Sequence, residues 1–174
     1  DKGVSKFDGQ NFKNFTGFDG LSEHETYFGY EDSRGRLWLY EKDGNLCFIK
    51  NDTAYNAGNN KLIGKLPIMG PFIQQMAEGK DSSLYICYKF GQVLKIDHGH
   101  FFWVIREKNP DDNPIWSISL KEDTGIIHTG TTDIRMEKDR IVSVSNVPEN
   151  SNFTDASYFL TSDARGVKIY NNGV

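Results

Sequence analysis

The feature that most constrains this chain is a short unit of strands and turns that returns several times along its 174 residues. The unit is best defined over residues 17–49, where stretches of alternating apolar residues are separated by turns that end in glycine. Alternation with a period of two, broken by Asp-Gly turns, is typical of an antiparallel meander. Three strands are predicted, at residues 26–30, 36–40 and 45–49. Three strands cannot bury a sheet face alone, so the unit must pack against further copies.

Further copies are visible in the strand that opens with glycine after a polar turn. This strand starts at Gly3, Gly44, Gly91 and Gly166, and residues 133–136 form a degenerate copy in the last, double-length gap. The period is roughly 40–47 residues with three or four strands per unit, which is typical of the blades of a β-propeller. Residues 70–79 could form a short helix, but their place in the repeat favours a strand.

The repeat predicts a single all-β domain: a β-propeller-type array of about four antiparallel meander blades, incomplete or part of a larger propeller. The approximate repeats are residues 1–23 (partial), 24–70, 71–113, 114–150 and 151–174 (partial). The register weakens after Met136, and residues 141–147 could either close one blade or open the next. Most of the 17 glycines fall at the repeat-spaced turns rather than in a phosphate-binding loop.

Composition excludes some classes of partner. The net charge is −4 and the basic residues are scattered, so no nucleic-acid groove is expected. No apolar run approaches the ~20 residues that span a bilayer, so membrane attachment is expected only through segments outside this sequence. The first residues, DKGVSKFDG, are not a signal peptide and indicate a processed or excised chain. Cys47 and Cys87 lie in apolar strands and are interpreted as buried free thiols. The alternative, a disulfide between them, requires that adjacent strands bring the two Cα atoms within about 7 Å.

The motif in residues 19–46 (DGL, then YFGYEDSRGRLWL, then DGNL) resembles the two-component regulator propeller repeat. Residues 7–16 (FDGQNFKNFT) resemble the linker between blades of that family. The sequence departs from the family pattern at Tyr40-Glu41, where the family has Gly-Thr. The third and fourth copies also have no tryptophan at the position equivalent to Trp38. The resemblance covers residues 3–49 well and weakens toward the C-terminus.

This resemblance implies a non-catalytic, extracytoplasmic sensor segment of a two-component signalling protein, linked to a histidine kinase outside this chain. It would bind a small ligand, such as a carbohydrate, and the location would be periplasmic or extracellular. The ligand would contact loops that enter the innermost strands or join the second and third strands of each blade. Residues in or beside these loops are the predicted ligand-binding set: His24, Glu41, Lys42, Lys89, Trp116 and Arg165.

The same sequence also supports other interpretations of single residues and of the whole chain. Trp38 could stack on a sugar, but its alternation with two leucines favours packing between blades. His98-Gly99-His100 could contribute to a metal site, but a hairpin turn explains it. We expect no cofactor, metal or catalytic residue. The alternative functions are a protein-interaction module that self-associates as a homo-oligomer, and a lyase or hydrolase on a propeller scaffold.

Overall fold

The structure is a computed structural model of the chain. It describes residues 3–21, 25–42, 44–68, 73–106 and 114–147, and the backbone alone of 156–160 and 166–170. Within these residues it is an all-β protein, with two single turns of 3-10 helix at Gly17–Asp19 and Ile63–Lys65. No described helix is long and apolar enough to cross a membrane.

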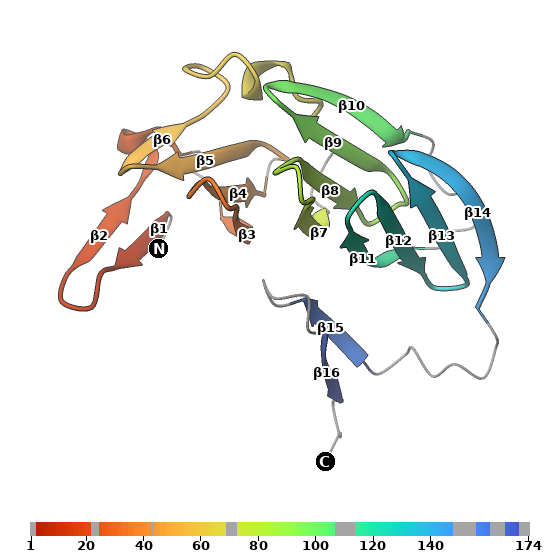
Figure 1. The fold of residues 1–174 in the computed structure, drawn as a ribbon. Helices are drawn as coiled ribbons and strands as arrows, with labels where there is room; N and C mark the ends of the chain where they lie inside the picture. The colour runs from red at the N-terminus through yellow and green to blue at the C-terminus, as the bar shows by residue number, and fades with distance from the viewer. Residues whose placement is uncertain are drawn as a thin grey trace.

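Three four-stranded antiparallel meanders form the body of the molecule. The first sheet contains β3 (Thr26–Glu31), β4 (Leu37–Glu41), β5 (Leu46–Lys50) and β6 (Thr53–Tyr55). The second contains β7 (Ile73–Glu78), β8 (Leu84–Tyr88), β9 (Val93–Asp97) and β10 (His100–Ile105). The third contains β11 (Ile115–Lys121), β12 (Thr124–Thr129), β13 (Thr132–Glu137) and β14 (Arg140–Asn146). The sheets follow one another along an arc, with β3, β7 and β11 on its inner side and β6, β10 and β14 on its outer side (Figure 1).

Two hairpins lie outside the three sheets in the sequence. The N-terminal hairpin pairs β1 (Val4–Phe7) with β2 (Phe12–Phe15), and the C-terminal hairpin pairs β15 (Ala156–Leu160) with β16 (Gly166–Tyr170). With the three sheets they make an all-β, propeller-type array of antiparallel blades, as the repeat predicts.

The meander gives the array two distinct edges. The turns that join the first strand to the second, and the third to the fourth, lie at one end of each sheet; this end is called the hairpin edge. The connections between second and third strands, and between successive sheets, lie at the other end, called the loop edge. Three of the tight turns on the hairpin edge have two central residues with positive φ. They are Asn51-Asp52, His98-Gly99 and Lys138-Asp139. Positive φ at both central positions is the geometry that matches the twist of paired strands.

The core is divided among the boundaries between successive sheets. Successive side chains of a strand point to opposite faces, so Trp38 packs toward the second sheet while Leu39 packs toward the N-terminal hairpin. Between the second and third sheets, Cys87 packs with Ile118 and Ile127. The first and second sheets therefore each contribute to two hydrophobic clusters, and the third contributes to one, so each unit depends on a neighbour for its core.

Several sequence predictions are confirmed by this fold. The three predicted strands of the first unit are β3, β4 and β5, and residues 73–78 form strand β7 rather than a helix. Trp38 is fully buried between sheets. The sequence left open whether residues 141–147 close or open a blade; residues 140–146 form β14 and pair with β13, so they close the third sheet. Cys47 and Cys87 are both buried thiols, in different clusters, and no disulfide joins them.

Candidate functional site

The loop edge of the first sheet contains a cavity of about 290 Å³. It is formed where the β2–β3, β4–β5 and β6–β7 connections meet, and we call it the Glu41 cavity. Its lining residues are Gly20, Leu21, Glu41, Gly44, Asn45, Leu46, Cys47, Asn56, Ala57, Gly58, Ile63, Gly64, Leu66, Pro67 and Ile68. Among these residues Glu41 carries the formal charge, and most of the others are apolar or glycine.

Glu41 is the last residue of β4 and is held by a tight turn. Its backbone N–H donates to the carbonyl of Asn45 at 3.0 Å, and its carbonyl accepts from the N–H of Gly44 at 2.9 Å. Two-residue alternation along β4 places Glu41 on the same sheet face as Leu39, so the residue is only 2% exposed. A carboxylate is rarely this buried unless its environment supplies hydrogen-bond donors.

The β6–β7 connection closes the cavity through a network of asparagine side chains. The Nδ2 of Asn56 donates to the carbonyl of Gly20 at 2.7 Å, and its Oδ1 accepts from the N–H of Gly58 at 2.8 Å. The Oδ1 of Asn59 accepts from the N–H of Asn56 at 2.8 Å, and its Nδ2 donates to the carbonyl of Ala54 at 3.1 Å. These bonds fix a long loop against the β2–β3 connection, so the cavity is preformed.

The Glu41 cavity combines one carboxylate and amide groups with an apolar wall that includes Ile63 and Leu66. This combination of many apolar contacts and a few fixed polar groups is typical of small-molecule sites. Carboxylate and amide oxygens accept hydrogen bonds, so the cavity suits a ligand that presents hydroxyl or N–H donors beside an apolar face.

Three of the other predicted site residues, Lys42, Lys89 and Trp116, do not line this cavity. Lys42 lies at the loop edge and forms an exposed ion pair with Glu25 at 3.6 Å. Lys89 is exposed in the β8–β9 turn, where its carbonyl accepts from the N–H of Ile115 at 3.2 Å. Trp116 is 44% exposed near the start of β11. His24 and Arg165 lie outside the described residues. The ligand-binding role of all six residues therefore stays a prediction.

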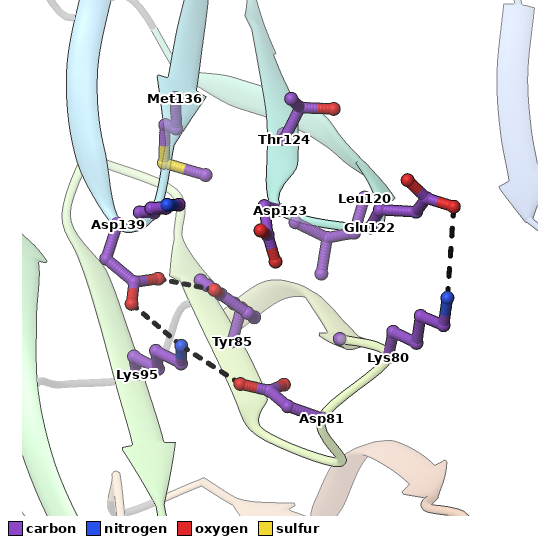
Figure 2. A pocket seen from close by; sticks show the side chains of 13 residues that line it. Lys80, Asp81, Tyr85, Lys95, Leu120, Glu122, Asp123, Thr124, Met136 and Asp139 are labelled. Atoms are coloured by element: carbon purple, nitrogen blue, oxygen red, sulfur yellow. Dashed lines mark hydrogen bonds and ion pairs between the residues drawn. The ribbon is translucent and has the colours of Figure 1, made fainter.

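A second cavity, of about 190 Å³, lies on the hairpin edge between the second and third sheets (Figure 2). Its lining residues come from the β7–β8, β11–β12 and β13–β14 turns and from the strands beside them. Lys95, Tyr85, Asp81 and Asp139 occupy one side of it, and Lys80 forms an ion pair with Glu122 on the other side at 3.8 Å.

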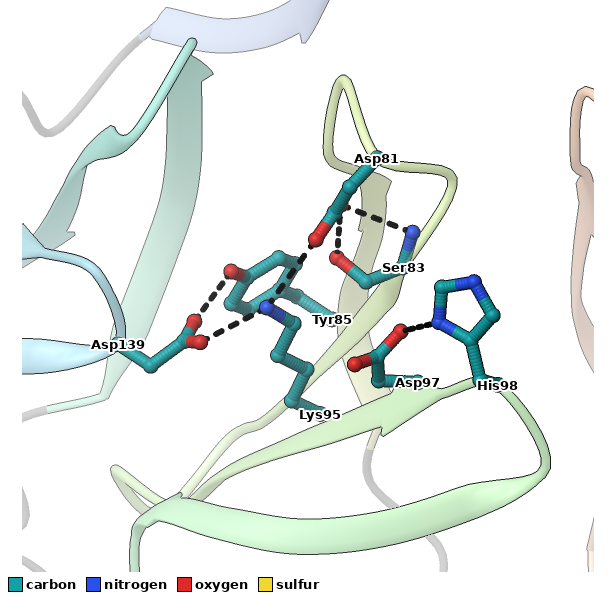
Figure 3. Close-up of polar contacts among 7 residues, drawn as sticks. All are labelled: Asp81, Ser83, Tyr85, Lys95, Asp97, His98 and Asp139. Atoms are coloured by element: carbon teal, nitrogen blue, oxygen red, sulfur yellow. Dashed lines mark hydrogen bonds and ion pairs between the residues drawn. The ribbon is translucent and has the colours of Figure 1, made fainter.

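Lys95 is the centre of a polar cluster that joins the second sheet to the third (Figure 3). Its Nζ lies 2.8 Å from Oδ2 of Asp139 in the β13–β14 turn and 3.5 Å from Oδ2 of Asp81 in its own sheet. The hydroxyl of Tyr85 donates to Oδ1 of Asp139 at 2.5 Å. The Lys95 side chain is 6% exposed, so both its stem and its charge are removed from solvent.

The cluster shifts the pKa values of its members. Burial opposes the charge of Lys95, but the hydrogen bond to Asp139 and the contacts with Tyr85 outweigh it, so the pKa of Lys95 lies above its ordinary value. Burial, together with the hydrogen bond to Asp139, raises the pKa of Tyr85 to about 12. Both groups therefore keep their protons at neutral pH, which leaves Asp139 as the acceptor for both.

The first sheet uses a different polar arrangement at the equivalent edge. Asp32, whose side chain is fully buried, accepts from Nε1 of Trp38 at 2.8 Å and from Nε of Arg36 at 2.6 Å. Burial pushes the pKa of Asp32 upward, but the hydrogen bonds from Trp38 and Arg36 outweigh it and the pKa is lowered. The next turn residue, Ser33, donates its hydroxyl to Oε1 of Glu78 in the second sheet at 2.6 Å. Polar contacts thus cross both boundaries on the hairpin edge.

Sequence reasoning missed the Lys95 cluster, although a signal was present. Lys95 pairs with Tyr85 across β8 and β9, as Phe48 pairs with Trp38 in the first sheet. A lysine at a repeat position occupied elsewhere by a buried phenylalanine indicates a buried charge, and Asp139 in a tight turn supplies its partner. Asn56, which shapes the Glu41 cavity, had no comparable signal because it lies in a long connection without a repeat counterpart.

Two of the described histidines, His98 and His128, make local contacts with aspartates. His98 and Gly99 form the β9–β10 turn, as predicted, and Nδ1 of His98 contacts Oδ1 of Asp97. His128 lies 2.8 Å from Oδ1 of Asp133 across β12 and β13. Among the described residues, no three His, Cys, Asp or Glu side chains are grouped so as to hold a metal ion.

Comparisons with known proteins give structural likeness only. Neither the models of protein families nor the curated protein sequences include a match to this chain. The extracellular domain of a hybrid two-component system from B. thetaiotaomicron has a TM-score of 0.59 at 14% identity, covering 87% of this chain and 20% of that chain. Virginiamycin B lyase from Staphylococcus aureus has a TM-score of 0.60 at 15% identity, covering 97% of this chain and 62% of that chain. A streptogramin B lyase has a TM-score of 0.57 at 13% identity.

These likenesses show the fold. The chain shares the propeller-type architecture both of an extracellular signalling domain and of an enzyme, and it spans about a fifth of the former and about three fifths of the latter. The two kinds of neighbour differ in function, so the fold alone does not select one of them.

Proposed function

We propose that this chain is a ligand-sensing segment of an extracytoplasmic propeller in a two-component signalling protein, and that the Glu41 cavity is part of its binding site. The observation that carries the proposal is the cavity itself, in which connections from three parts of the chain enclose a buried carboxylate on the loop edge. The sequence motif in residues 19–46 and the likeness to an extracellular signalling domain support the signalling context.

The ligand class follows from the lining of the cavity. Glu41 and the side-chain amide of Asn45 place polar groups in the lining, while Ile63 and Leu66 offer an apolar wall. A carbohydrate or another polyol presents hydroxyl donors around its rim and C–H groups on its faces, so it matches both parts of the lining. In this proposal, binding shifts the placement of sensor copies and passes a signal to a kinase outside the chain.

Calorimetric titration of the chain with a panel of neutral mono- and oligosaccharides tests the proposal. Glu41→Gln keeps the size of the side chain but removes its charge, and we expect it to weaken binding of the best ligand at least tenfold. Glu122→Gln on the hairpin edge is the matched control and should leave binding unchanged. If Glu41→Gln binds as tightly as the parent chain, or if both variants lose binding equally, the Glu41 cavity is not the site.

A further inference from the structure

The innermost strand of each of the three sheets carries a β-bulge near its start. In β3 the pairing with β4 shifts by one residue between Thr26 and Phe28, so Tyr27 is an extra residue. The pairing of β7 with β8 and of β11 with β12 shifts at the same point, and the extra residues there are Gln74 and Trp116. In all three sheets the bulge lies opposite the end of the second strand, at the loop edge. Tyr27, Gln74 and Trp116 therefore occupy equivalent positions, and we call them the bulge row.

All three side chains of the bulge row are exposed. Tyr27 is 53% exposed, Trp116 is 44% exposed, and Gln74 is also exposed. The next residue of the strand is turned inward instead: Phe28 packs between the first and second sheets, and Ser117 is 6% exposed. The strands that carry the row lie on the inner side of the arc (Figure 1), which is the side that lines the central channel of a β-propeller.

A bulge on an edge strand has two known uses. It prevents the edge from pairing with another chain, or it re-aims a side chain beside a functional site. The first use makes no demand on the extra side chain, and charged residues protect an edge best. The bulge row instead exposes two large aromatic rings with an amide between them, which favours the second use.

The row has hydrogen-bonding groups that a ligand can use. Within the described part of the chain, neither the indole N–H of Trp116 nor the side-chain amide of Gln74 bonds to another residue. The hydroxyl of Tyr27 donates to Oε2 of Glu25 at 3.3 Å, and Glu25 also pairs with Lys42 at 3.6 Å. These contacts hold Tyr27 beside polar groups of the loop edge and leave one face of the row lined by rings and amide.

The spacing of the row is fixed by contacts between the sheets. Oε1 of Gln75 accepts from the N–H of Ile118 at 2.8 Å, and its Nε2 donates to the Ile118 carbonyl at 3.5 Å. Each of these residues lies within two positions of the row. Packed sheets lie about 10 Å apart, so a row that crosses three of them extends over roughly 20 Å.

We infer that the bulge row binds a neutral oligosaccharide across the three sheets, with sugar rings stacked on Tyr27 and Trp116 and hydroxyl groups bonded to Gln74. The faces of a sugar ring carry C–H groups that pack on aromatic rings, and its hydroxyls pair with amide and indole groups. The length of the row selects a chain of several sugars over a monosaccharide. The inference rests on the proposed function for its ligand class, but its residues are separate from those that line the Glu41 cavity.

Calorimetric titration with neutral tetrasaccharides of glucose, mannose, galactose and xylose, and with the matching monosaccharides, tests the row. For the tetrasaccharide that binds best, Trp116→Ala and Tyr27→Ala should each weaken binding at least tenfold. Trp116→Phe keeps a ring and should weaken binding less than threefold. Phe102→Ala is the control, because this ring is 41% exposed on the outer strand β10, and it should leave binding unchanged.

Tryptophan fluorescence gives a second measurement on the same chains. Binding of the tetrasaccharide should change the emission of the parent chain, and Trp116→Phe should abolish that change. Trp38 is fully buried and Trp103 lies on the outer strand β10, so neither of them contacts the ligand in this inference.

The outcomes separate the bulge row from the Glu41 cavity. If the row variants bind as tightly as the parent chain while Glu41→Gln does not, the inference is wrong and the proposed function stands. If the row variants lose binding and Glu41→Gln does not, the inference holds and the Glu41 cavity is not the site. An equal loss in Phe102→Ala, or a monosaccharide that binds as tightly as its tetrasaccharide, would overturn the inference. If none of the saccharides binds, both are wrong.

Discussion

The ammonium group of Lys95 lies 2.8 Å from the carboxylate of Asp139, across the boundary between the second and third sheets. Lys95 belongs to β9, whereas Asp139 is the second central residue of the β13–β14 turn and has a φ of 63°. A tight turn in one blade thus presents the acidic partner of a lysine buried in the preceding blade. Contacts of this kind fix the placement of one blade relative to the next.

Replacing Asp139 by asparagine should destabilise the chain. The change leaves Lys95 charged and buried, with the 3.5 Å contact to Asp81 as its remaining ion pair, and it weakens the acceptor of the Tyr85 hydroxyl. We expect Asp139→Asn to reduce the free energy of unfolding by about 2 kcal/mol, the usual cost of losing a hydrogen bond to a charged group. Urea denaturation measures the change, and Asp123→Asn, at an exposed position of a neighbouring turn, is the control.

A second variant separates the ion pair from simple packing. Lys95→Met removes the buried charge instead of leaving it without its main partner, so it should cost less than Asp139→Asn. If Lys95→Met is the more damaging of the two, the ion pair between Lys95 and Asp139 adds net stability that an apolar side chain cannot replace, and the expected order of the two variants is wrong.

The buried carboxylate of Asp32, which accepts hydrogen bonds from Trp38 and Arg36, predicts how the stability of the chain depends on pH. The folded state lowers the pKa of Asp32 below its ordinary value of 3.8, so the unfolded chain binds the proton more readily. The contribution of this group is therefore present above pH 3.8 and is lost as the pH falls from there through the folded-state pKa. Asp32→Asn should be less stable at neutral pH and should lose less stability on acidification. Unfolding free energies measured from pH 7 down to pH 3 test this, and parallel pH profiles for the two chains would contradict it.

Much of the fold was predictable because its determinants are local. Alternating apolar residues and Gly-containing turns define the strands of the first two sheets, and the repeat gives their order. The third sheet was harder to interpret, since Gly125 stands where Leu84 lies in the second sheet and the glycine-opened strand is degenerate. Whether residues 141–147 close or open a blade depends on pairing with β13, which is not a local property.

The site was less predictable, for a physical reason. Glu41 could be proposed because it stands at a strand end, where the repeat places a loop. The wall of its cavity comes from Asn56 and Ile63 in the β6–β7 connection, whose path is fixed by long-range bonds such as that from Asn56 to Gly20. Lys42, proposed on the same grounds as Glu41, instead lies in an exposed ion pair.

The reactivity of each cysteine thiol should show when the packing around it opens: Cys87 between the second and third sheets, and Cys47 between the first sheet and the N-terminal hairpin. Cys87 is fully buried between the second and third sheets, and burial raises the pKa of its thiol. Cys47 is buried against the N-terminal hairpin, most of whose side chains are exposed. We expect neither thiol to react with a disulfide reagent in the native state, because the reactive form is an accessible thiolate. In mild denaturant Cys47 should react first, since the boundary with a two-stranded hairpin is the weaker one. Rates measured in Cys47→Ala and Cys87→Ala chains test this order, and equal rates would indicate a single cooperative opening.

Gly20 offers a direct test of how the Glu41 cavity is held together. Its φ is +98°, and a Cβ added there would lie 2.9 Å from Nδ2 of Asn56, the group that donates to the Gly20 carbonyl. Gly9 has nearly the same conformation, with a φ of +100°, but open space where a Cβ would be. An alanine at either position meets the strain of a left-handed backbone, about 1–2 kcal/mol. The alanine at position 20 must also displace Asn56, which adds about 1 kcal/mol for a lost hydrogen bond. Gly20→Ala should therefore reduce the free energy of unfolding more than Gly9→Ala does, and it should weaken ligand binding while Gly9→Ala leaves it unchanged. If the two variants are equally stable and bind equally well, the contact from Asn56 to Gly20 does not shape the cavity.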